Sequence, residues 1–166
     1  RSDFSETALY ETYDVTEALS EGTNALGVAL GRARYGELSD AWGWSDVDWW
    51  SDPELRFQMD VQLADGSTRT ITSDQTWKTT DGPIRRDSLY AGEHYDARKE
   101  RPGWTTPGYD DDEWTAAVRS DGPAGSLTNQ HLEPITVRDT ITPVERTQPE
   151  PGVYVFDVGE MVAGWP

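Results

Sequence analysis

Cysteine is absent from this sequence of 166 residues, which excludes a disulfide framework and thiolate metal sites. No apolar run is long enough to cross a bilayer, and no basic segment followed by an apolar one opens the chain. We therefore expect no membrane partner and no signal peptide in this stretch of sequence. The length suits one domain with a hydrophobic core.

Lysine is also scarce, and acidic residues dominate the charge. Only Lys78 and Lys99 are lysines, and 14 basic residues stand against 31 acidic ones, for a net charge of −17. Such a field repels nucleic acid and anionic lipid, so we expect no nucleic-acid partner. An acidic, lysine-poor surface is typical of halophilic proteins, because salt screens the self-repulsion. An ordinary acidic protein is the alternative.

Alternation with a period of two dominates the chain, and helical periodicity is slight. Residues 57–63 predict a half-buried strand, residues 64–67 a turn, and residues 68–72 a returning strand. Residues 25–30 predict another strand, whose small face would let a second layer approach closely. Strands separated by turn signals indicate an all-β sandwich. Its long loops, 31–53 and 81–107, would carry the function.

The last part of the chain also has an extended pattern. Residues 135–144 predict a strand that Pro143 and the proline-rich stretch 147–152 would stop. Residues 153–156 are apolar on both faces, as in a central buried strand.

Two short helical turns are expected within this β-rich pattern. Asp14 is placed to cap one of them, which Gly22 would end. Asp110 or Asp111 would cap the other, which presents Trp114. The acidic run 110–113 also suggests a metal cluster, but carboxylates at a helix N-terminus before a buried tryptophan fit it better.

Tryptophan is concentrated in the loop 41–50, which holds four indoles. Four rings in a polar loop are costly to leave in water without a reason. One interpretation is a sugar-stacking platform with Asp46 and Asp48 as oxygen ligands, because flat rings stack on the apolar face of a sugar. The other is a small core of folded-back rings that pins the loop.

The segment 87–98 interleaves aromatic rings with carboxylates, a combination that points to carbohydrate. Calcium takes about six to eight oxygens, so Asp87, Glu93 and Asp96 with loop carbonyls would suffice for a calcium site. In the alternative, Arg98 pairs with Glu93 or Asp87 and locks the loop.

Signals for catalysis are poor. Neither histidine has a nucleophile at a recognisable spacing, and no phosphate-binding loop, nucleophile elbow or zinc-binding helix motif occurs. Glycosidase chemistry needs two carboxylates at a set separation, and carboxylates are too common here to choose a pair. We therefore expect no catalytic residue and no enzyme activity in this chain by itself.

Four groups of residues carry a family resemblance. They are Tyr13-Asp14-Val15-Thr16 with Asn24-Ala25-Leu26-Gly27-Val28; Trp77 with Gly82-Pro83-Ile84, Leu89-Tyr90, Gly92-Glu93 and Tyr95-Asp96-Ala97-Arg98; Trp104 with Pro107-Gly108-Tyr109-Asp110-Asp111 and Trp114; and Tyr154-Val155-Phe156-Asp157-Val158-Gly159 with Gly164-Trp165. Together they resemble the N-terminal accessory domain of bacterial-type α-L-rhamnosidases of glycoside hydrolase family 78. Ala91 departs from that family, which often has Asn or Asp before the Gly-Glu pair.

The resemblance implies a jelly-roll β-sandwich, galactose-binding-domain-like, over residues 1–150. Residues 151–166 would be a strand leading into the next domain of a parent glycoside hydrolase, whose catalytic domain would follow. It also implies a carbohydrate-binding module for terminal L-rhamnose or rhamnosides, with calcium bridging sugar and protein. The expected sugar contacts are Trp44, Trp49, Asp87, Tyr90, Glu93 and Arg98, and the expected calcium ligands are Asp46, Asp48, Asp87, Glu93 and Asp96. The alternative is a structural scaffold domain that packs against neighbouring domains of the parent enzyme without binding sugar.

Overall fold

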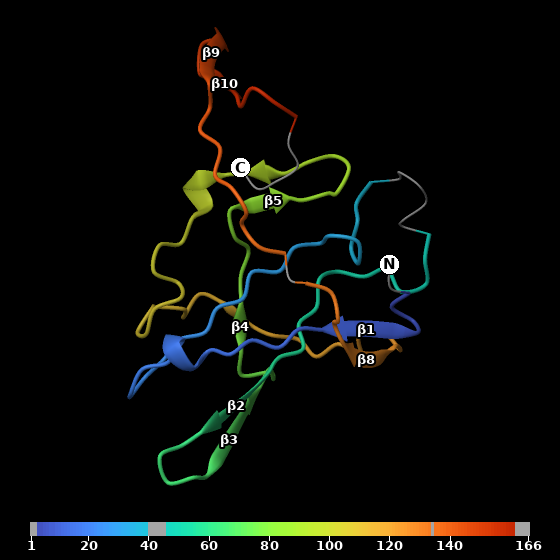
Figure 1. The fold of residues 1–166 in the computed structure, drawn as a ribbon, viewed down its shortest axis with the longest axis vertical. Coiled ribbons are helices and arrows are strands. Elements are labelled where there is room, and N and C mark those ends of the chain that lie inside the picture. The colour runs from blue at the N-terminus through green and yellow to red at the C-terminus, as the bar shows by residue number, and fades with distance from the viewer. Residues whose placement is uncertain (1–2, 40–45, 134, 162–166) are drawn as a thin grey trace. The chain divides into compact units, whose positions relative to one another are not determined.

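The structure is a computed structural model that describes residues 3–39, 46–133 and 135–161 (Figure 1). In these residues the regular elements are ten short strands and two single-turn 3-10 helices, η1 (Thr16–Ala18) and η3 (Ala97–Lys99). The strands pair two by two. The chain divides into two units, Arg1–Gln130 and His131–Pro166. The all-β class expected from the alternating pattern is confirmed, and no helix of the described part is long and apolar enough to cross a membrane.

β2 (Gln58–Gln62) and β3 (Thr68–Thr72) form a hairpin (Figure 1), and β2 follows the predicted alternation. Met59 and Val61 are half-buried while the polar residues between them are exposed, so one face of the strand turns away from water. At the turn, the Leu63 amide donates to the Ser67 carbonyl over 2.8 Å. Gly66 supplies a φ of +84°, which other residues rarely adopt.

Three further pairs lie in the first unit. β1 (Thr7–Tyr10) runs parallel to β8 (Ser126–Asn129), β4 (Lys78–Thr79) runs antiparallel to β7 (Thr115–Ala116), and β5 (Ile84–Arg86) runs antiparallel to β6 (His94–Tyr95). Gly125 lets the chain enter β8 beside the start of β1, because a Cβ there would lie 2.5 Å from the Phe4 carbonyl oxygen. The Asp14 carboxylate accepts from the Thr16 amide just before η1, but the N-cap residue is Val15, and the turn ends at Ala18 rather than at the predicted Gly22.

The segment 25–30 is not a strand in the structure, which corrects that prediction, but its small face does admit a close neighbour. A Cβ on Gly27 would lie 2.2 Å from Cζ3 of Trp104. Trp104 in turn lies 6.4 Å from Trp114, and Tyr109 lies 5.8 Å from Trp114, measured between ring centroids. The first and third groups of the family signature are therefore in direct contact.

The second unit contains a hairpin of β9 (Glu145–Glu150) and β10 (Val153–Asp157). Two predictions for this region are wrong. Residues 135–144 form no strand, and the strand lies instead in the proline-rich stretch, since an outer edge tolerates the missing N–H of Pro149. The segment 153–156 is exposed rather than buried, because a two-stranded hairpin has no flanking strands to cover it.

Candidate functional site

The two long loops of the first unit meet at Glu37, whose side chain is 0% exposed. One carboxylate oxygen accepts from the Ser39 amide over 2.8 Å and from the Ser88 hydroxyl over 2.6 Å. The other accepts from the Leu89 amide over 2.7 Å. Burial would raise the pKa of Glu37, but these hydrogen bonds outweigh it and hold the pKa below its ordinary value. Glu37 is therefore a buried, ionised junction between the loops, and no pattern in the sequence distinguishes it from the other carboxylates.

The loop Ser88–Gly92 is a tight turn that presents two large side chains. Ser88 and Gly92 exchange backbone hydrogen bonds, each 3.1 Å long. The Ser88 hydroxyl also accepts from the amides of Tyr90 and Ala91, over 3.2 and 2.9 Å. At the tip, Leu89 is 59% exposed and Tyr90 is 47% exposed. The expected sugar-stacking residue Tyr90 thus lies on an exposed loop whose backbone is closed by hydrogen bonds.

Trp50 brings a second ring to the same junction. Its indole N–H donates to the Glu37 carbonyl oxygen over 2.8 Å, and the side chain remains 38% exposed. Trp50 and the Tyr90 loop are therefore both attached to one buried residue. The density of tryptophan in the loop was the available signal for Trp50, but sequence does not distinguish between adjacent rings.

Trp49 is placed differently from the expected sugar platform. It is only 8% exposed, with its ring centroid 4.9 Å from Phe4 and 6.3 Å from Tyr35, and the Arg34 guanidinium lies 5.3 Å from the centroid. These contacts fit the alternative of a small core that pins the loop, so the stacking role of Trp49 is corrected. Trp44 lies outside the described residues.

Asp87 makes a second connection between the loops. Its carboxylate accepts from the Arg32 amide over 2.5 Å. Glu93 is half-buried, and Asp46 and Asp48 are exposed. Over the described ranges, no group of three or more His, Asp or Glu side chains could hold a metal ion. The expected calcium ligands are thus not brought together here, and calcium binding stays a prediction.

Arg98 pairs with a carboxylate other than the two expected. Its guanidinium donates twice to Asp96, with both nitrogen–oxygen distances 2.8 Å, and Asp96 also caps η3. The two bonds from Arg98, helped by its amide, lower the pKa of Asp96. The predicted pairing of Arg98 with Glu93 or Asp87 is wrong, because Arg98 pairs instead with Asp96, two residues before it, and its side chain is 88% exposed.

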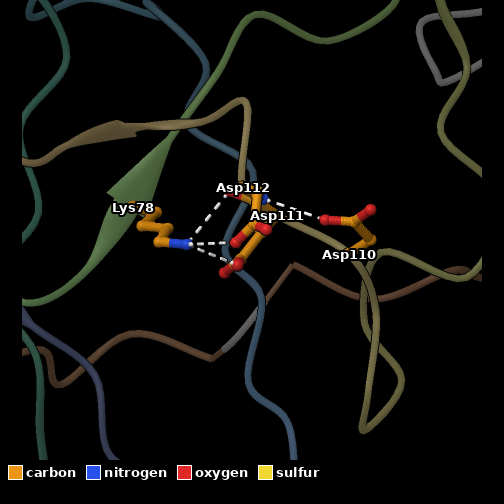
Figure 2. Close-up of polar contacts among 4 residues, drawn as sticks. All are labelled: Lys78, Asp110, Asp111 and Asp112. Carbon is orange, nitrogen blue, oxygen red and sulfur yellow. Dashed lines mark hydrogen bonds and ion pairs between the residues drawn. The ribbon is translucent and has the colours of Figure 1, made fainter.

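The acidic run before Trp114 has a structural role, as expected, but the predicted helical turn is absent, since residues 110–114 contain a turn and no helix. Figure 2 shows the Lys78 ammonium group, on β4, directed at this run. Lys78 Nζ lies 2.6 Å from the Asp111 carboxylate, 3.1 Å from the Asp111 carbonyl and 3.8 Å from the Asp112 carboxylate. The Asp110 side chain accepts from the Asp112 amide over 3.1 Å and so caps the turn.

Comparison with known proteins gives the family. A model described as the alpha-L-rhamnosidase N-terminal domain matches residues 1–139. The chain belongs to this family. An α-L-rhamnosidase of Streptomyces avermitilis is 34% identical over 164 residues, which are 98% of this chain and 16% of that enzyme. The chain thus spans about a sixth of the length of this relative.

Two solved rhamnosidase structures share the fold. The α-L-rhamnosidase of Dictyoglumus thermophilum superposes with a TM-score of 0.79 at 41% identity, over 96% of this chain and 17% of that one. The Streptomyces avermitilis enzyme in complex with L-rhamnose gives 0.74 at 34% identity, over 96% and 15%. The predicted rhamnosidase family and β-sandwich class are confirmed.

Proposed function

We propose that this α-L-rhamnosidase N-terminal domain is a non-catalytic module that binds terminal L-rhamnose for a parent α-L-rhamnosidase. The observation that carries the proposal is the pair of exposed rings, Trp50 and Tyr90, attached to one buried residue from two different loops. The rhamnose complex of the related Streptomyces avermitilis enzyme supports the choice of sugar. The chemistry of bond cleavage would lie elsewhere in the parent chain.

Sugar recognition at this site combines apolar and polar contacts. Rings stack on the C–H face of a pyranose, and Leu89 offers an apolar contact for the methyl group that L-rhamnose carries in place of a hydroxymethyl. Hydroxyl contacts, or a bridging calcium ion, would fall to the carboxylates close in sequence to the two rings: Asp46 and Asp48 near Trp50, and Glu93 near Tyr90. Asp87 contributes by holding the loop through Arg32.

A calorimetric titration of the chain with L-rhamnose in high salt, with calcium and again with chelator, tests the proposal. Saturable heat that chelator abolishes would support a calcium-dependent module. Heat that persists with chelator would support sugar binding and contradict a role for calcium. L-Mannose, which differs only in its C6 hydroxyl, is the matched ligand control and should bind more weakly.

Substitution of Tyr90 by alanine should lower the affinity about tenfold, a loss of ~1.4 kcal/mol, because the ring is a central contact. Trp50→Ala should have a similar effect. Tyr13→Ala removes an exposed tyrosine that is distant in sequence from Trp50 and Tyr90, and it should leave the titration unchanged. No heat with any ligand, from a chain shown to be folded by near-ultraviolet circular dichroism, would refute sugar binding.

A scaffold role is the second candidate, and the exposed apolar hairpin of the second unit favours it. Val153, Tyr154, Val155 and Phe156 are all exposed in the described chain, and exposed apolar surface of this kind is covered in stable assemblies. If the domain is a scaffold, an external quencher should reach Trp50 in the isolated chain and not in the parent enzyme. L-Rhamnose should then leave the fluorescence unchanged.

A further inference from the structure

We propose that Glu37 is a positioning residue for sugar recognition, which holds the loop Ser88–Gly92 in the conformation that presents Leu89 and Tyr90. The inference rests on the proposed function, because it assigns that loop to the sugar. Glu37 itself is fully buried and would not touch the ligand.

The backbone of the loop depends on the carboxylate. The amides of Tyr90 and Ala91 both donate to the Ser88 hydroxyl oxygen. With that oxygen accepting twice, its single hydrogen is left to donate to Glu37, over 2.6 Å. The Leu89 amide donates to the second oxygen of the same carboxylate. Three successive amides of the loop are therefore fixed by Glu37, either directly or through Ser88.

Only an acceptor fits at this position. The Glu37 side chain receives three donors, from Ser39, Ser88 and Leu89. A glutamine of the same shape would turn an N–H₂ group toward at least one of these donors, and a buried donor without an acceptor is costly. The isosteric substitution thus breaks the support of the loop while it changes almost no volume.

Order in this loop bears on affinity because the exposed tip is where a ligand would bind. A side chain and loop that are already fixed lose less conformational entropy when a ligand arrives. Trp50 is attached to the backbone of the same residue, because its indole N–H donates to the Glu37 carbonyl. Glu37 therefore sets the position of both proposed stacking rings, one through its side chain and one through its backbone.

The test compares Glu37→Gln with Glu113→Gln, which neutralises an exposed carboxylate of the same type. Titration with L-rhamnose, in the buffer in which the unaltered chain binds best, gives the affinity. Amide hydrogen exchange gives the order of Leu89, Tyr90 and Ala91. Glu37→Gln should lower the affinity about tenfold and speed exchange at these three amides, while exchange in the β2–β3 hairpin stays slow. Glu113→Gln should change neither measurement.

A double substitution separates positioning from general destabilisation. If Glu37 acts through Tyr90, then Tyr90→Ala should cost less affinity in the Glu37→Gln background than in the unaltered chain. Ser88→Ala provides a second route, since it removes only the hydroxyl link, and should loosen the Tyr90 and Ala91 amides even if Glu37→Gln fails to fold.

The outcomes separate this inference from the function on which it rests. If the unaltered chain binds and both Glu37→Gln and Ser88→Ala keep its affinity, the positioning role is refuted and sugar binding stands. If amide exchange at the loop speeds up while the affinity for L-rhamnose is unchanged, the role is likewise refuted. The order that Glu37 gives to the loop would then not contribute to binding. If the unaltered chain binds no sugar, the proposed function fails and the positioning role fails with it.

Discussion

Replacing Gly27 by alanine would place a methyl group against the indole of Trp104. The added Cβ would lie 2.2 Å from Cζ3 and 2.8 Å from both Cε3 and Cη2 of that ring. An aromatic ring is rigid, and Trp104 is itself close to Trp114, so one of the two segments must shift. Overpacking of this kind costs about 1–3 kcal/mol, and the restricted unfolded chain offsets about 0.4–1 kcal/mol. We expect a net destabilisation of about 1–2 kcal/mol.

The measurement is thermal or urea unfolding, followed by fluorescence. For a chain of this size, 1 kcal/mol corresponds to a change of about 2–4 °C in Tm, so Gly27→Ala should lower Tm by about 2–8 °C. Gly82→Ala is the matched control, because no atom lies within 4 Å of a Cβ there. Neither glycine has a φ in the left-handed region. The control should be as stable as the unaltered chain or slightly more so.

A second variant tests whether the Trp104 ring causes the loss of stability in Gly27→Ala. In a Trp104→Leu chain, the ring that meets the new methyl group is gone, so Gly27→Ala should cost less there than in the unaltered chain. If Gly27→Ala and Gly82→Ala have equal stability, Trp104 does not lie over Gly27 and the packing described above is incorrect.

Two further predictions concern charged groups. Lys78→Met should destabilise the chain slightly in urea unfolding at low salt, and less in 1 M NaCl, because a partly exposed ion pair with Asp111 is lost. Lys99→Met, at an exposed position, should have no effect. The lowered pKa of Glu37 means that its contribution is present above the unfolded value of about 4.3 and is lost as the pH falls through the folded pKa. Glu37→Gln should therefore flatten the dependence of unfolding free energy on pH below about 4.5, and an unchanged slope would contradict this.

Local patterns in the sequence predicted local structure well. The alternation in 57–63 and the turn at 64–67 gave the β2–β3 hairpin, because both depend on neighbouring residues. A structural role for the acidic run before Trp114 was also predicted, but the expected helical turn is absent: residues 110–114 contain a turn and no helix, and Asp111 pairs with Lys78, which is 33 positions away. The segment 25–30 shows the limit of such patterns. Its small residues serve a close contact with Trp104 rather than a strand, and that partner is 77 positions away.

The candidate site was less predictable, because its bonds join distant loops. Glu37 is 51 residues from Ser88 and 52 from Leu89, and in a chain with 31 acidic residues nothing in the sequence marks one carboxylate as buried. Trp49 and Trp50 are identical, adjacent residues in the sequence, yet Trp49 is in the small core and Trp50 is partly exposed. A residue's burial depends on which segment covers it, and periodicity in a loop does not supply that information.

The chemistry of the loop junction is suited to a chain of net charge −17. Paired charges at the surface, such as Asp96 with Arg98, weaken as salt screens them. Glu37 is instead held by a hydroxyl and two amides, which are neutral donors, and its side chain is buried. Screening acts little on such buried hydrogen bonds. Salt that relieves the repulsion among the surface carboxylates therefore leaves the hydrogen bonds that support the Tyr90 loop intact. High ionic strength can thus stabilise the chain without weakening the proposed recognition surface.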